Sequence, residues 1–391
     1  MYILNDFLFA LDPETICMKY QLDTMSEKVP FVNPSLQDYL FRIKKEINQY
    51  KDKWEKIKKI TNKYEFVNTV CYIERLNLNI CVCNYKPISR SYFKLIEILN
   101  HFHFEFPNTI NSFHLAEGPG GFIEALTKYR KNPNDNYYGM TLMETHKDIP
   151  NWNKIQQFMM QNKNIHLVYG PKKDGNLYLR HNLNYIKKQH NNKYDFITAD
   201  GGFDYSVDFN KQEESSVNLI FCEVLYALIL QKNGGSFVLK IFDMFYENTI
   251  ELIYLLSFFY KQVYIYKPYT SREANSEKYI ICKDFSIKKN YSKIIDRLCL
   301  NFKDLSKQKL CKIFSFEINS YFLSKIQEIN AIYGQQQVEN ILTTINYIQE
   351  SYKLNKEKFD KIKLYNLEKC ITWCKDNKQS YYPELEQVLN S

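Results

Sequence analysis

The stretch LAEGPGGFIEAL, residues 115–126, decides the fold prediction. It holds three of the chain's eleven glycines within four positions, after the apolar run SFHL and before the amphipathic segment GFIEAL. This pattern is typical of a strand that turns sharply into a helix, because glycine lets the backbone turn tightly and approach a ligand closely. A strand-to-helix corner that binds no ligand is the simpler alternative.

The spacing of these glycines excludes two common phosphate-binding loops. The run E-G-P-G-G-F lacks the GxGxxG spacing of dinucleotide-binding folds, and the sequence contains no P-loop GK[S/T]. Glu117 stands at the mouth of the turn, where an acid would repel a phosphate. The turn therefore favours a ligand with positive charge. S-adenosylmethionine, which carries an ammonium and a sulfonium, fits that requirement, and a Rossmann dehydrogenase is the weaker alternative.

Short apolar runs alternate with helical segments from about residue 90 to 285. The runs are SFHLAEG, YYGMTL, IHLVYG, YDFITAD, GGSFVLKI, QVYIYKP and EKYIICKDF. Strand–helix alternation predicts βαβ units, and hence a Rossmann-like α/β fold with a mostly parallel seven-stranded sheet and helices on both faces. Ligands of such sheets bind outside the carboxyl ends of the strands, so the residues that follow each run are candidates for the site.

The regions on either side of this alternation differ from it. Residues 36–60 place apolar side chains at spacings of three and four, which predicts one amphipathic helix with a lysine-rich opposite face. Residues 292–378 are also expected to be helical and are rich in lysine. We therefore predict a helical N-terminal extension (1–85), an α/β domain (86–288) and a helical C-terminal region (289–391).

Composition restricts the class of protein. The 391 residues carry a formal charge of +8 together with 32 tyrosines and 27 phenylalanines. Basic charge and aromatic faces suit single-stranded nucleic acid, although an AT-biased genome explains the same composition equally well. The ten cysteines form no CxxC pair, which argues against a zinc ribbon and for reduced thiols in an intracellular protein. Neither a signal peptide nor an apolar run of about 18 residues is present, so no membrane contact is expected.

Four positions carry candidate catalytic side chains. Lys94 lies in SRSYFKLIEIL, Asp200 ends the run YDFITAD, Lys240 ends GGSFVLK, and Glu277 begins the last run. Each alone has an ordinary explanation as a solvated charge or a turn former. In a doubly wound sheet, however, Asp200 and Lys240 both fall on the ligand-binding edge.

Together these residues resemble the Lys-Asp-Lys-Glu tetrad of the FtsJ-type RNA 2′-O-methyltransferases, with Lys94, Asp200, Lys240 and Glu277 in that order. The motifs EGPGGF, GMTL, ADGGF and SREANSEKY are most similar to those of the mRNA cap methyltransferases of eukaryotes and large DNA viruses. The resemblance extends over about residues 62–285. It implies a class I S-adenosylmethionine-dependent enzyme that converts cap 0 to cap 1, or cap 1 to cap 2.

The same resemblance implies the site residues and partners. It implies cofactor contacts from Ala116, Glu117, Gly118, Pro119, Gly120, Gly121, Phe122, Asp174 and Gly175, and RNA contacts from Asn210, Gln212 and Asn275. Capped mRNA is the expected partner, with other capping or transcription proteins as further candidates, in the nucleus or cytoplasm, or in the host cytoplasm or virion of a virus. The alternatives are 2′-O-methylation of uncapped rRNA or tRNA, and a non-catalytic RNA-binding subunit of a capping or polymerase complex.

The residue types also predict a mechanism. A ribose 2′-hydroxyl is a poor nucleophile that must lose its proton as it attacks. A lysine can accept that proton only if its pKa falls well below about 10.4, and a neighbouring ammonium would lower it. We therefore assign Lys240 as general base and Lys94 as its electrostatic partner. Asp200 would orient Lys240, and Glu277 would hold Lys94 or the ribose. The reaction requires no metal.

Overall fold

The computed structural model describes residues 2–4, 11–22, 29–73, 77–143, 151–203, 208–288, 290–303, 305–350 and 356–390. The chain folds into two compact units, each assembled from segments distant in sequence. The first unit comprises Met1–Pro34, His103–Lys267 and Glu277–Asn330, and the second comprises Ser35–Phe102, Pro268–Ser276 and Ala331–Ser391. These two units do not coincide with the predicted division of the chain at residues 85 and 288, which stays a prediction.

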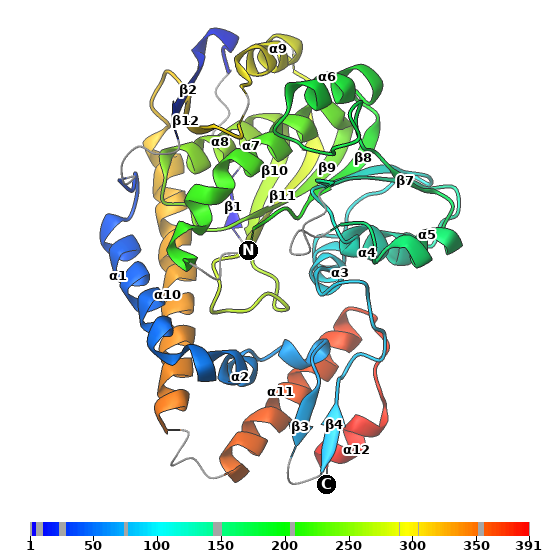
Figure 1. The fold of residues 1–391 in the computed structure, drawn as a ribbon, viewed down its shortest axis with the longest axis vertical. Helices are drawn as coiled ribbons and strands as arrows, with labels where there is room; N and C mark the ends of the chain where they lie inside the picture. Colours follow the sequence, from blue (N-terminus) through cyan, green and yellow to red (C-terminus); the bar gives the residue numbers. More distant parts are fainter. Residues whose placement is uncertain are drawn as a thin grey trace. The chain divides into compact units, whose positions relative to one another are not determined.

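An eight-stranded sheet forms the centre of the first unit (Figure 1). In spatial order its strands are β1 (Tyr2–Ile3), β10 (Tyr260–Tyr266), β11 (Lys278–Phe285), β9 (Gln231–Ile241), β8 (Tyr194–Ala199), β5 (Asn111–Leu115), β6 (Asn136–Met140) and β7 (Ile165–Leu167). The strands from β9 to β7 pair in parallel, whereas β11 is antiparallel to both β9 and β10. The predicted Rossmann-like α/β fold is confirmed, and β1 adds an unpredicted eighth strand at the edge.

The parallel register brings the expected site positions to one edge. Met140, Leu115, Ala199 and Leu239 form a single row across β6, β5, β8 and β9. One position further along each strand lie Thr141, Ala116, Asp200 and Lys240. The antiparallel strand β11 begins at the same edge, because Tyr279 is the register partner of Lys240. The carboxyl ends of four strands and the start of a fifth therefore border one region, as the sequence predicted.

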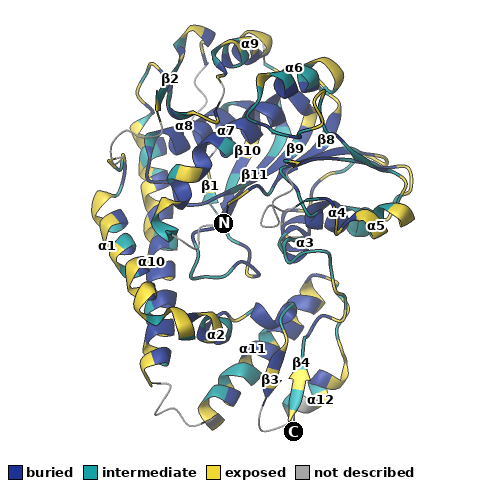
Figure 2. Ribbon diagram, in the orientation of Figure 1, coloured by how far each residue is buried: buried dark blue, intermediate teal, exposed yellow. Residues whose placement is uncertain are grey.

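Helices cover both faces of this sheet. They are α4 (Gly121–Arg130), α5 (Gln156–Gln161), α6 (Arg180–Gln189), α7 (Gln212–Leu230), α8 (Glu247–Phe259) and α9 (Tyr291–Asn301). Figure 1 shows α6, α7 and α8 on one side of the sheet and α4 and α5 on the other. Most residues of α7 and α8 are buried (Figure 2), as expected of helices that are apolar on nearly every side.

A second, two-stranded sheet pairs β2 (Ile16–Leu22) with β12 (Gln308–Phe314). The C-terminal region is helical, as predicted, apart from β12, and the N-terminal extension contains strands as well as helices. Glu251 of α8 accepts the backbone amides of Ile313 and Phe314, which fixes β12 against that helix. The two strands are almost 300 residues apart in sequence, so a reading of local periodicity could not pair them.

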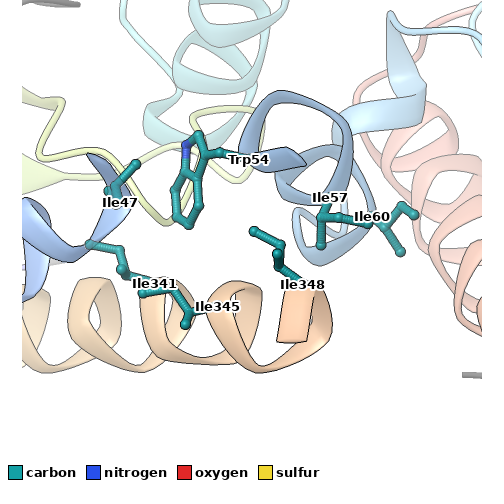
Figure 3. Packing of buried hydrophobic residues seen from close by; sticks show 7 residues of the cluster. All are labelled: Ile47, Trp54, Ile57, Ile60, Ile341, Ile345 and Ile348. Carbon is teal, nitrogen blue, oxygen red and sulfur yellow. The ribbon is translucent and has the colours of Figure 1, made fainter. Parts of the chain in front are cut away.

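The second unit is mainly helical. It contains α1 (Pro34–Glu46), α2 (Lys51–Thr61), α3 (Ser91–Phe102), the later part of α10 (Ser320–Glu350), α11 (Lys356–Asp376), α12 (Glu384–Asn390) and the hairpin β3 (Cys71–Ile73) and β4 (Leu78–Ile80). The predicted single helix over 36–60 is wrong, because a 3-10 turn at Ile47–Tyr50 separates α1 from α2. Packing against α10 explains the break between the two helices. The hydrophobic cluster in Figure 3 joins the 3-10 turn and α2 to α10, and its members are Ile47, Trp54, Ile57, Ile60, Ile341, Ile345 and Ile348.

Two buried carboxylates tie the segment 268–276 to the rest of the second unit. Glu65 accepts hydrogen bonds from the guanidinium groups of Arg90 and Arg272 at 2.8–3.1 Å. Burial alone would raise the pKa of Glu65, but the two guanidinium groups outweigh it and lower the pKa to about 2. Glu97 of α3 accepts the amides of Tyr269 and Thr270 at 2.6 and 3.2 Å. The segment is thereby held to the helix that carries Lys94.

None of the ten cysteines, all of which lie within the described residues, forms a disulfide bond. Across the described ranges, no helix combines the length and the apolar character needed to cross a membrane. The same residues bring together no group of three histidine, cysteine, aspartate or glutamate side chains with the arrangement of a metal site.

Candidate functional site

The turn between β5 and α4 is left-handed at two positions. Ala116 has a φ of 49° and Gly120 a φ of 107°, both in the region that favours glycine. The amide of Gly120 donates to the carbonyl of Glu117 at 2.7 Å, and α4 begins at the next residue. The strand–turn–helix corner predicted from LAEGPGGFIEAL is confirmed.

The carboxyl group of Glu117 is buried at this turn and has one unsatisfied oxygen. Oε1 accepts the amide of Phe122 at 2.5 Å, whereas Oε2 has no hydrogen-bond partner within the described part of the chain. Burial raises the pKa of Glu117 well above its usual range; the Asp200 carboxylate adds to the rise, and the Lys240 ammonium opposes it. A buried oxygen without a partner can accept a hydrogen bond from a bound ligand.

Thr141 joins the glycine turn to the loop that carries Gly175. Its Oγ1 accepts the amide of Gly118 at 3.2 Å. Its backbone oxygen would lie only 1.8 Å from a Cβ at Gly175, whose φ is 59°. Because a backbone oxygen cannot move aside easily, this position requires glycine. The two segments expected to hold the cofactor therefore meet at the end of β6.

The carboxylate of Asp174 is engaged within its own loop. It accepts the amide of Asn176 and the ring nitrogen Nε2 of His181, each at 2.9 Å, and the side-chain amide of Asn182. Burial would raise the pKa of Asp174, but these hydrogen bonds outweigh it and hold the pKa below the usual value. In this conformation the carboxylate organises the loop, and the backbone carbonyl of Asp174 accepts the amide of Met143 at 2.8 Å.

Asp200 and Lys240 form a pair where β8 and β9 reach the common edge. The Lys240 Nζ donates to the backbone oxygen of Asp200 at 2.8 Å and lies 3.3 Å from its carboxylate Oδ1. The hydroxyl of Tyr279, on β11, donates to the same Oδ1 at 2.8 Å. Only 11% of the Lys240 side chain and 13% of the Asp200 side chain are exposed, so this is a largely desolvated ion pair.

The carboxylates around Lys240 raise the pKa of its amine. Burial alone would lower that pKa, but Asp200 first, then Glu277 and Glu223, favour the charged form and move the pKa upward. The prediction that the pKa of Lys240 is lowered is therefore wrong for the residues of the first unit that surround it. It assumed that a second ammonium dominates, whereas the residues of this unit that influence Lys240 are acids.

Glu277 precedes β11 and is 8% exposed. Its backbone carbonyl accepts a hydrogen bond from Nζ of Lys267 at 2.9 Å, across the two ends of the segment 268–276. The side chain acts on Lys240 electrostatically, as noted above. Glu277 therefore belongs with Asp200 and Lys240 in the same unit.

Glu223 was missed by the sequence reasoning. It lies in the middle of α7, fully buried, and its Oε1 accepts the amide of Gly201 at 3.2 Å. The signal was available, because Glu223 is the single charged residue in VNLIFCEVLYALIL, residues 217–230. A charge in such a run needs a specific partner, and the contact with Gly201 supplies it.

The remaining expected residues fall into two groups. Asn210 lies in the 3-10 turn Phe209–Lys211, where its amide donates to Oδ1 of Asp208 at 2.9 Å, and Gln212, the first residue of α7, is buried. Lys94 and Asn275 belong to the second unit, on α3 and in the segment 268–276 respectively. Asp200, Lys240 and Glu277 thus lie together in the first unit, and the roles assigned to all of these residues stay predictions.

The variant Gly120→Val is expected to lower the affinity for S-adenosylmethionine by about tenfold or more. A Cβ at Gly120 would lie 2.4 Å from Cδ1 of Ile155, and the residue has a positive φ. The sequence predicted that glycine allows this turn to approach a ligand closely; the structure adds that backbone strain and collision with Ile155 would displace the turn in the variant.

The matched control is Gly234→Val, because Gly234 also has a positive φ, of 80°, but a Cβ there meets no atom within 4 Å. Titration calorimetry, with thermal unfolding recorded on the same samples, measures both variants. Unchanged affinity in Gly120→Val would contradict the role given to the turn.

Residues 87–285 match the family model described as FtsJ-like methyltransferase. The chain is 31% identical over 264 residues to cap-specific mRNA (nucleoside-2′-O-)-methyltransferase 2 of Pongo abelii, covering 65% of this chain and 34% of that protein. The protein of that name from Danio rerio is 30% identical over 352 residues, covering 82% of this chain and 44% of the other.

A protein of Caenorhabditis briggsae with the name inactive cap-specific mRNA (nucleoside-2′-O-)-methyltransferase 1B is 29% identical over 288 residues, covering 68% of this chain and 33% of its own length. The chain therefore spans less than half the length of the curated proteins that it matches.

Proposed function

The chain belongs to the FtsJ-like methyltransferase family, and from this premise we propose that it transfers a methyl group from S-adenosylmethionine to a ribose 2′-hydroxyl of capped mRNA. Transfer to the first or second transcribed nucleotide would convert cap 0 to cap 1, or cap 1 to cap 2. The observation that carries the proposal is the buried pair of Asp200 and Lys240 at the carboxyl ends of two parallel strands, within the region that matches the family.

The acidic character of this edge supports a cationic cofactor. The carboxylates of Asp200 and Glu277 outnumber the ammonium of Lys240, so that an additional positive charge would be favoured here, and such a charge would also favour the ionised form of Glu117, whose pKa burial raises. We infer that the segments 116–122 and 174–175 would hold S-adenosylmethionine, with the unpartnered Oε2 of Glu117 as an acceptor. When bound, this cofactor supplies a methyl group on a positively charged sulfur.

Lys240 is the proposed proton acceptor. Its nitrogen would take the proton of the 2′-hydroxyl as that oxygen attacks, and Asp200 would hold the amine in place through the contacts at 2.8 and 3.3 Å. Since the carboxylates around Lys240 raise its pKa, the neutral amine is scarce at pH 7, and the reaction rate should increase with pH. Glu277 would complete the set in this unit.

The family resemblance adds a further catalytic residue and the residues that would contact RNA to this proposal. It assigns Lys94 as a second amine of the catalytic set, and Asn210, Gln212 and Asn275 as contacts with RNA or ribose. The hydrogen bonds from the amides of Tyr269 and Thr270 to Glu97 support a role for the segment 268–276 as a fixed element, because they attach it to α3, the helix of Lys94. Partners beyond capped mRNA would be other capping or transcription proteins, inside the nucleus or cytoplasm.

A non-catalytic RNA-binding role is the second candidate, because one of the matched proteins has a name that calls it inactive. The paired Asp200 and Lys240 support the catalytic proposal over this one, since a protein selected only for binding has no need to keep a buried ion pair at the strand ends.

Three short RNAs of the same sequence test the proposed function. One is capped, one is capped but 2′-deoxy at the first two nucleotides, and one is uncapped. With labelled S-adenosylmethionine, we expect label to enter the first RNA alone. Equal labelling of the uncapped RNA would favour an rRNA or tRNA substrate. Binding of the capped RNA without labelling would favour the non-catalytic role.

A further inference from the structure

The peptide group between Asp200 and Gly201 is held at both of its polar atoms. Its carbonyl oxygen accepts the Lys240 ammonium at 2.8 Å, and its N–H donates to Oε1 of Glu223 at 3.2 Å. Both atoms belong to one rigid plane, so Lys240 and Glu223 together fix its orientation. The Cα of Asp200 lies in that plane, and the position of the carboxylate therefore depends on both contacts.

Glu223 packs directly against this turn. A Cβ at Gly201 would lie 2.3 Å from Oε1 of Glu223, 2.8 Å from Cδ2 of Leu219 and 2.9 Å from Cβ of Ala116. Gly201 is therefore enclosed by α7 on one side and the glycine turn on the other. Because the space is full, the Gly201 amide has a defined neighbour, and that neighbour is the carboxyl of Glu223.

Burial of this carboxyl group is costly, which argues against packing as its purpose. Glu223 has no exposed surface, and its second oxygen, Oε2, has no hydrogen-bond partner among the residues that the structure describes. Burial raises the pKa of Glu223 to about 8, with Lys240 opposing the shift and Asp200 adding to it. The group is therefore mainly neutral at pH 7, and an apolar residue would fill the same volume at lower cost.

We propose that Glu223 is a positioning residue for methyl transfer: by accepting the Gly201 amide, it fixes the Asp200–Gly201 peptide and so orients the carboxylate that pairs with Lys240. This inference rests on the proposed function. In this role Glu223 acts through Asp200 and does not itself contact RNA or cofactor. Its substitution should therefore change turnover rather than the binding of either ligand.

Two variants separate the hydrogen bond from the volume of the side chain. Glu223→Gln keeps an oxygen that can accept the Gly201 amide and resembles the neutral acid, whereas Glu223→Met keeps the length and removes the acceptor. We expect Glu223→Met to lower kcat on capped RNA by about 100-fold, with KM for RNA changed less than about threefold, and Glu223→Gln to keep kcat within about threefold of wild type.

The matched control is Glu251→Met. Glu251 is also a buried helical carboxyl that accepts backbone amides, those of Ile313 and Phe314, but in β12 rather than beside Asp200. The Glu251→Met variant should be less stable than wild type but should keep the same kcat per folded molecule. A loss of kcat in Glu223→Met no greater than in this control would overturn the proposal, and so would a Glu223→Gln variant as inactive as Glu223→Met.

An activity-independent measurement distinguishes this inference from the proposed function. Selective ¹⁵N labelling of the eleven glycines allows hydrogen exchange of the Gly201 amide to be followed. Protection should persist in Glu223→Gln and disappear in Glu223→Met. If this pattern is seen in a protein that methylates no capped RNA, the contact between Glu223 and the Gly201 amide stands and the proposed function is refuted. If Gly201 stays protected in Glu223→Met, the contact itself is refuted. If Glu223→Met does not fold, a tenfold loss of kcat in Glu223→Gln overturns the proposal, and near-wild-type kcat with retained protection supports it.

Discussion

Lys240→Met is expected to lower methyl transfer to capped RNA by about 10³-fold or more, while S-adenosylmethionine still binds with similar affinity. The substitution removes the proposed proton acceptor and leaves the Asp200 carboxylate without its ion pair. Methionine keeps most of the volume of the lysine side chain, so the packing of β9 against its neighbours should survive. Single-turnover transfer of a labelled methyl group measures the rate, and titration calorimetry measures the cofactor affinity.

Lys232→Met is the matched control on the same strand. Lys232 lies near the start of β9, pairs with Asp195 at 2.9 Å and is 55% exposed, so its ion pair contributes little to stability. We expect this variant to keep a rate within about twofold of wild type. A Lys240→Met enzyme that retained more than about a tenth of wild-type turnover would refute the role of Lys240.

The single-turnover rate is expected to rise by about 100-fold between pH 7 and pH 9. The pKa of Lys240 is raised above its ordinary value by Asp200, Glu277 and Glu223, so fewer than about one amine in a thousand is neutral at pH 7. Below the pKa, each unit of pH multiplies the neutral fraction by about ten, and a rate that depends on the neutral amine must follow.

Two controls accompany this pH series. The residual rate of Lys240→Met should not show the same dependence, because its side chain does not titrate. Circular dichroism across the range checks that the fold persists, since burial raises the pKa of Glu223 to about 8 and the stability that its protonated form contributes is lost as the pH rises through that value. A level profile from pH 7 to pH 9 would show that Lys240 acts as a permanent cation rather than as a base.

Much of the first unit could be predicted from local sequence. Apolar runs of six to nine residues separated by helical periodicity identified the seven strands from β5 to β11, because a buried strand between helices leaves a local apolar pattern in the sequence. The rule that ligands bind at the carboxyl ends of parallel strands then brought Asp200 and Lys240 together, and the structure places them 3.3 Å apart.

Features that depend on distant contacts could not be predicted. The pKa of Lys240 follows from acids at positions 200, 223 and 277, whose distances no local pattern gives. The pairing of β2 with β12 and the break between α1 and α2 are likewise set by partners far away in the chain. Glu223 could have been found, because a charge inside a long apolar run indicates a buried contact, but its partner Gly201 could not.

The segment 268–276 shows that compact units need not follow the order of the chain. It lies between β10 and β11, two neighbouring strands of the first unit, yet it groups with the second unit. The carboxylates of Glu65 and Glu97 account for this, since each is buried and binds the segment through Arg272 or through backbone amides. Nothing in the sequence PYTSREANS indicates those partners.

The most direct test of the account is to locate the transferred methyl group on a capped oligoribonucleotide. After reaction with labelled S-adenosylmethionine, the RNA is digested with a nuclease that requires a free 2′-hydroxyl, and the products are identified by mass spectrometry. We predict label on the ribose of the first or second transcribed nucleotide, in a resistant fragment that contains the cap. Label on a base, on the cap guanine or on internal nucleotides would contradict the account, and so would an unlabelled RNA.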